Sequence, residues 1–118
     1  WVDWNMVLDK QGGPNWFKNW CVAPVIVDPE NDEVYFTPIY YTLAHFSRFI
    51  RPGATRIGVE NTDDSLMVTA AQNPDGTIAV VIFNQAERAK GFNLSLGGKS
   101  INITVSAQAI QTVLIPKD

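Results

Sequence analysis

The first twenty residues combine flat aromatic side chains with short amides and a carboxylate. They run Trp1-Val2-Asp3-Trp4-Asn5, then Gly12-Gly13-Pro14-Asn15-Trp16, then Asn19-Trp20. Sugars present apolar C–H faces and polar hydroxyl edges, so a sugar-binding wall needs aromatic rings for stacking and amides or carboxylates for the hydroxyls. A packed aromatic cluster beside a Gly-Gly-Pro turn explains the same residues. Spacing alone favours that structural interpretation, because aromatic side chains are above all core material.

Other chemically capable side chains are isolated from the partners that chemistry needs. Cys21 is the only cysteine, so neither an internal disulfide nor a thiolate metal cluster can form. His45 is the only histidine and has no neighbouring ligands, which favours a structural role. Asp63 and Asp64 are typical of a solvated turn. The sequence therefore predicts no metal-binding and no cofactor-binding residues.

Two stretches fit the acceptor pattern for N-glycosylation, Asn93-Leu94-Ser95 and Asn102-Ile103-Thr104. The pattern is common, and both stretches lie in predicted strands. They matter only if the source of the protein glycosylates its proteins.

A change in composition at Arg51-Pro52-Gly53 predicts a boundary between domains at 1–51 and 52–118. The first part is rich in aromatic residues and begins with a predicted buried strand over Val2 to Leu8 and a loop. A second extended stretch, Ala23 to Val27, leads through a polar turn into a helix that begins at Thr37-Pro38 and runs to Ile50. The Thr37 hydroxyl is expected to accept hydrogen bonds from the first helical amides.

The second part predicts an antiparallel β-domain. Its clearest unit is a hairpin, in which Ser65 to Gln72 and Thr77 to Phe83 flank the turn Asn73-Pro74-Asp75-Gly76. Turn signals recur at roughly ten-residue spacing, which favours a β-sandwich over a parallel sheet. Further strands are expected at Thr55 to Glu60, Gly91 to Leu96, Ser100 to Val105 and Ala109 to Ile115.

Length and charge exclude several classes of protein. With 118 residues, the chain is too short for a complete (β/α)8 barrel, which needs roughly 250. A net charge of -3 offers no basic face for nucleic acid. The apolar runs are far shorter than the roughly 20 residues of a membrane span. The chain opens on a tryptophan without a basic leader, which suggests a truncated or processed piece.

Most of the sequence resembles the C-terminal portion of glucosylceramidases, which belong to glycoside hydrolase family 30. The opening aromatic stretch, Gly12 to Trp16 and Pro24 to Asp28 look like the eighth barrel strand and the loop after it. Tyr40 to Ile50 resembles the last barrel helix. The resemblance continues into the final β-domain and thins after about Ala86. It implies a mainly β chain, with an antiparallel β-sandwich-type domain preceded by the last βα unit of a (β/α)8 barrel.

The resemblance implies retaining hydrolysis of β-glucosidic bonds by two carboxylates roughly 5 to 5.5 Å apart. In the family both glutamates lie on earlier barrel strands, so no catalytic residue is assigned here. Glu60 precedes Asn61 in the reverse of the family order and lies near the end of a predicted strand, away from any barrel mouth. The implied substrate-binding residues are Trp4, which borders the sugar, Asn19 on the active-site loop, and Asp3, which positions its neighbours.

Three hypotheses follow. The chain is the C-terminal part of a β-glucosidase that supplies a glucose-site wall, a stand-alone carbohydrate-binding module, or a structural β-domain without catalysis. The first implies a β-glucoside or glucosylceramide substrate and the remainder of the barrel as partners. Under the third, the β-domain lacks strands that the family builds from the far N-terminus, which implies self-association through exposed strand edges. The resemblance implies a lysosomal or secreted location. Where the family more often has Phe followed by Val, this sequence has Trp20 and Cys21. The family's loop packing and aglycone preference are therefore not carried over to this chain.

Overall fold

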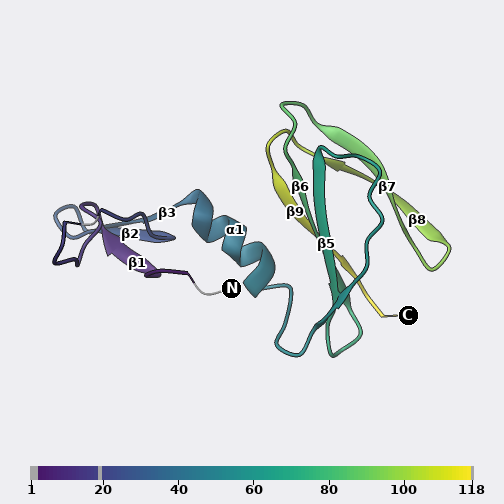
Figure 1. Cartoon of the computed structure of the whole chain (residues 1–118), viewed down its shortest axis with the longest axis horizontal. Coiled ribbons are helices and arrows are strands. Elements are labelled where there is room, and N and C mark those ends of the chain that lie inside the picture. The colour runs from purple at the N-terminus through teal and green to yellow at the C-terminus, as the bar shows by residue number, and fades with distance from the viewer. Residues whose placement is uncertain (1–2, 19, 118) are drawn as a thin grey trace. The chain divides into compact units, whose positions relative to one another are not determined.

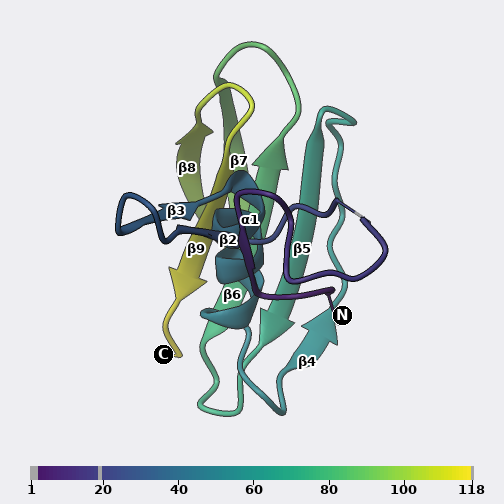
Figure 2. The same cartoon turned by 90° about the vertical axis from the view of Figure 1, so that its left-hand side faces the viewer.

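The computed structural model describes residues 3–18 and 20–117, which form two compact units, residues 1–44 and 45–118 (Figures 1 and 2). The chain is mainly β. Helix α1, Pro38–Ser47, begins in the first unit and ends in the second. Within the described residues, the helical structure is too short and too polar to cross a bilayer.

The first unit is built around a three-stranded sheet in the order β1-β2-β3. Strands β1, Val7–Asp9, and β2, Val25–Asp28, run parallel, and β3, Glu33–Phe36, returns antiparallel to β2. A parallel pair needs a long connection, and the loop of residues 10–24 provides it. The carboxyl end of β1 therefore opens directly into that loop.

Two strand predictions in this unit were inaccurate. Of the predicted strand Val2 to Leu8, Val2 lies outside the described residues. Strand β1 begins only at Val7 because Asn5 has a φ of 34°, a left-handed conformation that an extended strand cannot include. Strand β3 was not predicted. It follows the polar turn after Asp28 and has only four residues, all exposed, so no burial pattern marked it.

The helix begins at Pro38 as predicted, but Thr37 acts differently from the expectation. Its hydroxyl donates to the carbonyl oxygens of Ala23 and Pro24, both at 3.1 Å. Thr37 also donates its amide to Pro24 O at 2.9 Å. The residue therefore fastens the start of the helix to the end of the long loop, and the prediction that its side chain caps the helical amides was wrong.

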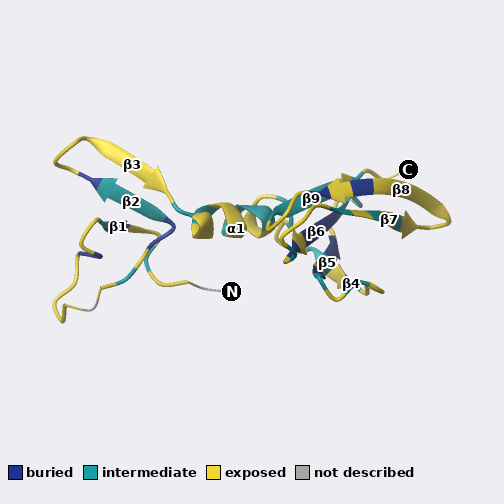
Figure 3. Ribbon diagram, turned by 90° about the horizontal axis from the view of Figure 1, so that it is seen from above, coloured by how far each residue is buried: buried dark blue, intermediate teal, exposed yellow. Residues whose placement is uncertain are grey.

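Little of the first unit is buried. Among its described residues, the buried apolar side chains are Leu8, Ala23 and Pro24, and Asp28 is 2% exposed. Strand β3 and much of the long loop are exposed instead (Figure 3), with large apolar side chains such as Phe17 and Val34 among them. The helix, too, buries none of its side chains, and its apolar residues Ile39 and Phe46 are exposed in this chain.

The second unit contains the predicted antiparallel strands. A four-stranded sheet has the order β4-β5-β6-β9, and β7 and β8 form a separate two-stranded sheet. The bounds are β4 Thr55–Ile57, β5 Leu66–Gln72, β6 Ile78–Asn84, β7 Lys90–Leu96, β8 Lys99–Val105 and β9 Ile110–Ile115. The predicted strand over residues 55–60 is thus half its expected length, whereas the others agree within a residue.

The turn that joins β5 to β6 has the predicted chemistry. Gly76 donates its amide to Asn73 O at 2.9 Å and has a φ of 88°, which glycine adopts without a steric penalty. The Asn73 side chain is buried and ties this turn to the end of the helix. It accepts a hydrogen bond from the Arg51 amide and donates to Phe49 O, both at 2.9 Å.

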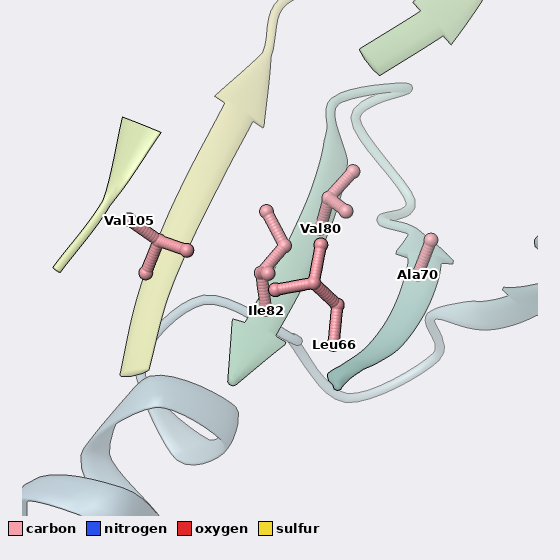
Figure 4. Close-up of a cluster of buried hydrophobic side chains, with 5 residues drawn as sticks. All are labelled: Leu66, Ala70, Val80, Ile82 and Val105. Carbon is pink, nitrogen blue, oxygen red and sulfur yellow. The ribbon is translucent and has the colours of Figure 1, made fainter. Parts of the chain in front are cut away.

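The core of the second unit lies between its two sheets. Leu66, Ala70, Val80, Ile82 and Val105 form the buried cluster (Figure 4), and Phe92 and Leu94 of β7 pack against it. The side chains of β6 alternate between the two faces of the sheet, yet residues 79–82 are all buried. The central strand β6 is therefore covered on both faces, and Val80 and Ile82 on one of them belong to the core between the sheets.

The fully buried Asn84 holds the end of β6 to the segments around it. Its amide nitrogen donates to Arg88 O at 2.8 Å and Ser106 O at 2.9 Å, and its oxygen accepts from the Ala86 amide at 3.0 Å. A buried amide with both ends paired stabilises the loops that it joins. His45 makes another long-range side-chain contact, with Nδ1 2.8 Å from the Thr112 hydroxyl.

Asp63 connects the turn before β5 to β7. It accepts hydrogen bonds from the Ser65 hydroxyl at 2.5 Å and the Ser65 amide at 2.9 Å, and it pairs with Lys90 Nζ at 2.9 Å. These contacts favour the charged carboxylate, and the Ser65 hydroxyl contributes most. They lower the Asp63 pKa to about 2.

The stability of the second unit should therefore depend on Asp63 at acidic pH. A carboxyl with a depressed pKa in the folded state stabilises the fold fully above its unfolded pKa of 3.8, and the contribution is lost as the pH falls toward 2. Asp63→Asn should lower the Tm at pH 6, and the difference from wild type should shrink between pH 4 and pH 2. Asp64→Asn is the matched control. A difference that stays constant across this range would contradict the assigned contacts.

Candidate functional site

The loop that leaves β1 is shaped by the carboxylate of Asp9. This side chain accepts hydrogen bonds from the amides of Gln11, at 2.9 Å, and Gly13, at 2.7 Å. The backbone closes the same turn, since the Asp9 amide donates to Gly13 O at 2.8 Å and the Gly12 amide donates to Asp9 O at 3.0 Å. Asp side chains favour such local turns. The first turn of the loop is therefore defined by hydrogen bonds rather than by packing.

Gly12 lies where the two ends of the loop approach each other. A Cβ at this position would stand 2.7 Å from the backbone nitrogen and 2.8 Å from the backbone oxygen of Cys21. The φ of 74° adds a conformation that L side chains rarely adopt. Only glycine fits both conditions, so the chain can double back and place Cys21 beside the Asp9 turn.

An ion pair fastens the other side of the loop. Lys10 Nζ lies 2.7 Å from a carboxylate oxygen of Asp28 at the end of β2, and Asn31 donates to the same oxygen at 2.8 Å. The Lys10 hydrogen bond, followed by that of Asn31, lowers the pKa of Asp28. The hydrogen bond to Asp28 likewise raises the pKa of Lys10. Asp28 therefore stays ionised and anchors the residue that follows β1.

The long loop and the residues just before β1 line an open pocket with a volume of about 710 Å³. Its wall combines aromatic rings, amides and the tight backbone at Gly12, and the lining residues are Trp4, Asn5, Gly12, Pro14, Asn15, Trp16, Phe17 and Cys21. Trp4, Trp16 and Phe17 are 71%, 94% and 86% exposed. Their rings are exposed in this chain and can contact a ligand.

The residues predicted to bind substrate fall in different places. Trp4 lines the pocket, next to Asn5. Asp3 does not line it. The Asp3 carboxylate accepts a hydrogen bond at 2.9 Å from the Trp4 amide, so it contacts the residue that does. Asn19 lies outside the described residues.

Sequence reasoning missed Phe17 as a wall residue. It lines the pocket beside Trp16, whereas Trp20, which the sequence pattern included, does not. The available signal was its position within the same loop, directly after a tryptophan. Spacing in a loop has no fixed period, so the sequence could not tell which aromatic rings face one hollow.

The chemistry that this wall can provide is recognition rather than proton transfer. Asn5 and Asn15 have amides that can bind hydroxyl groups, and the aromatic rings can stack on apolar C–H faces. The wall contains no carboxylate, since its lining residues are aromatic, amide, glycine, proline and cysteine. Among the described residues, no three His, Cys, Asp or Glu side chains come together as a metal site requires.

Both units match models of one enzyme family. The TIM-barrel domain of glycosyl hydrolase family 30 matches residues 1–50, and the beta sandwich domain of glycosyl hydrolase family 30 matches residues 53–113. The boundary between the two matches lies beside Arg51-Pro52-Gly53, whereas the compact units divide after Ala44.

Relatives and solved structures agree with these matches. Over 89 residues, the chain is 43% identical to the lysosomal acid glucosylceramidase of Mus musculus. The matched region covers 73% of this chain and 17% of the mouse protein. SrfJ from Salmonella typhimurium has a TM-score of 0.94 at 32% identity and covers 98% of this chain and 26% of its own. The endo-beta1,6-glucanase BT3312 has a TM-score of 0.88 at 30% identity over 97% of this chain and 26% of its own. The chain therefore spans less than a quarter of the mouse relative's length.

Gly12→Ala should disrupt the wall of the pocket. The added methyl group meets backbone atoms that cannot rotate away, and the residue must also keep a positive φ, so we expect a loss of roughly 1–3 kcal/mol in the stability of the loop. Limited proteolysis between residues 10 and 24 should become faster, and tryptophan fluorescence should shift. Gly58→Ala is the matched control, because a Cβ there meets nothing within 4 Å. Equal proteolysis of the two variants would contradict the close approach at Cys21.

Proposed function

The chain belongs to glycosyl hydrolase family 30, and we propose that it supplies one wall of the glucose site in a longer retaining β-glucosidase of the glucosylceramidase type. Its β-sandwich domain follows a βα segment of the family's TIM barrel. The observation that supports the proposal most is the pocket lined by Trp4, which precedes β1, and Trp16, which lies in the loop after β1; both rings are exposed beside amides. Barrel enzymes build their active sites from the loops that follow their strands, as the loop that carries Trp16 follows β1.

In this proposal each wall residue binds or orients the sugar. Trp4 borders the apolar face of the glucose ring, and Asn19 hydrogen-bonds to the sugar or holds the loop in place. Asp3 positions Trp4 through the hydrogen bond to the Trp4 amide. The wall thereby holds the ring and excludes water on one side, which orients the glycosidic bond for the catalytic groups.

The catalytic carboxylates are assigned to other strands of the barrel. Retaining hydrolysis needs two carboxyl groups about 5–5.5 Å apart, one as nucleophile and one as acid/base. The pocket wall contributes neither. We therefore assign no catalytic residue to this chain, and the chemistry requires the remainder of the barrel as a partner.

The exposed apolar surface of the first unit supports that partnership. Val7 of β1, Val34 of β3 and Tyr41 of the helix are between 46% and 56% exposed. Surfaces of this kind mark interfaces. We propose that the other strands and helices of the barrel cover them, and that the isolated chain associates with itself instead.

A β-glucoside such as glucosylceramide is the proposed substrate. The sequence is 43% identical to a glucosylceramidase and 30% identical to an endo-beta1,6-glucanase, so the first relative supports the substrate more strongly. Both names concern β-linked sugars with glucose at the cleaved bond, which the same aromatic wall can accommodate.

The 118-residue chain alone should show no turnover of an aryl β-glucoside. The reason is the missing pair of carboxylates at the pocket, because a wall that only binds sugar cannot replace acid/base and nucleophilic catalysis. The measurement is release of the chromogenic aglycone by the purified chain. Turnover that survives repurification and is unaltered by Trp4→Ala would contradict the proposal.

In the longer hydrolase, Trp4→Ala should lower kcat/KM for the same substrate. Loss of aromatic contact with the sugar is expected to cost on the order of 1.4 kcal/mol, or about tenfold. Phe83→Ala is the matched control, since it truncates an exposed aromatic ring of the second unit that does not line the pocket. A stand-alone sugar-binding module in the β-domain makes the opposite prediction, that the 118-residue chain carrying Trp4→Ala keeps its full affinity for sugar.

A further inference from the structure

The two N-glycosylation patterns of the sequence meet in the fold. One lies on β7 and the other on β8, and their asparagines, Asn93 and Asn102, are directly opposite each other in the register of the hairpin. The Nδ2 of Asn102 donates to the Oδ1 of Asn93 at 3.0 Å. Both residues are exposed. Two patterns that looked independent in the sequence therefore occupy one spot on the surface.

The face that carries them is polar along its whole length. Ser95 and Ser100 form the next cross-strand pair, with their hydroxyl oxygens 3.2 Å apart, and Thr104 lies opposite Gly91 on the other side. All four are exposed. The hydroxyl groups of both acceptor patterns, those of Ser95 and Thr104, are thus on the same outward face as the asparagines.

The opposite face of the hairpin provides the packing. Phe92, Leu94 and Val105 alternate with the polar residues and belong to the core cluster or pack against it. A group attached to Asn93 or Asn102 extends into solvent and displaces none of these side chains. The hairpin turn itself, Gly97-Gly98, has positive φ at both residues and joins the strands without distorting this alternation.

We propose that the outward face of the β7–β8 hairpin is an N-glycan attachment site with Asn93 and Asn102 as acceptors. The donor is an oligosaccharide linked through diphosphate to a polyisoprenoid lipid. Its C1–O bond to the diphosphate breaks, a bond forms between C1 and the asparagine Nδ2, one Nδ2 proton is released to base, and the lipid diphosphate leaves. The product amide keeps one N–H, so Asn102 retains a donor for its partner Asn93.

The cross-strand amide pair alone does not account for the arrangement. An Asn–Asn contact needs two amides facing each other, and any residue could stand two positions further along each strand. Here a hydroxyl residue occupies both of those positions, on the same exposed face. This proposal is independent of the sugar-site proposal, because it concerns the second unit and a covalent modification.

The test is secretion of the full chain from a eukaryotic cell behind a cleavable signal peptide. We expect a product of raised mass that an Asn-glycan amidase reduces to the mass of the polypeptide, leaving Asp at the modified positions for peptide mass spectrometry. Ser95→Ala should remove the glycan from Asn93 alone, and Thr104→Ala from Asn102 alone. A secreted wild-type chain without glycan at either position would overturn the proposal.

The structural part of the proposal has its own readout. The glycosylated chain and the same chain after amidase treatment should have equal near-ultraviolet circular dichroism and Tm values within a few degrees, because the attachment face makes no core contacts. The variant Asn93→Gln, Asn102→Gln provides the matched chain that never carried a glycan. A glycosylated product that lacks the circular dichroism of this variant would show that the face is not free, and would contradict the assignment.

Discussion

Burial of apolar side chains is the constraint that separates the two units. The sheet of the first unit has three strands of three or four residues, and the buried apolar side chains in its described part are Leu8, Ala23 and Pro24. So little core cannot compensate for the entropy of ordering a long loop. Hydrogen bonds from the carboxylate of Asp9, the close approach at Gly12 and the ion pair between Lys10 and Asp28 hold the loop instead. The aromatic wall is exposed as a consequence.

The second unit meets the same constraint within its own sequence. Strand β6 is buried along residues 79–82, and the polar face of the β7–β8 hairpin is balanced by an apolar face that packs on the core. Asn84 and Asn73 pair their amides with backbone groups at the two ends of that strand. The second unit thus buries enough apolar side chains to stabilise its own strands. The barrel segment is joined in the chain to this stable domain.

The sequence predicted the second unit more closely than the first, for physical reasons. The short apolar run in Ile78–Asn84 and the turn beginning at Asn73 are local signals that burial and glycine geometry reinforce. In the first unit, the left-handed Asn5 shortens β1, and β3 has no buried side chain to create a pattern. Trp4 and the Gly12–Trp16 segment were recognised as a possible wall from residue type. That Phe17 joins the wall and Asp3 stands behind it depends on loop geometry, which no sequence period encodes.

The central claim is that this wall contacts glucose in the assembled hydrolase. The most direct measurement is a crystal structure of the longer protein that contains this chain, with glucose or a glucose-configured inhibitor bound. The account expects ring carbons of the sugar within about 4–4.5 Å of the Trp4 indole and a hydroxyl within hydrogen-bonding distance of Asn19. A sugar bound in the barrel without contact to either residue, or bound instead on the β-sandwich, would contradict it.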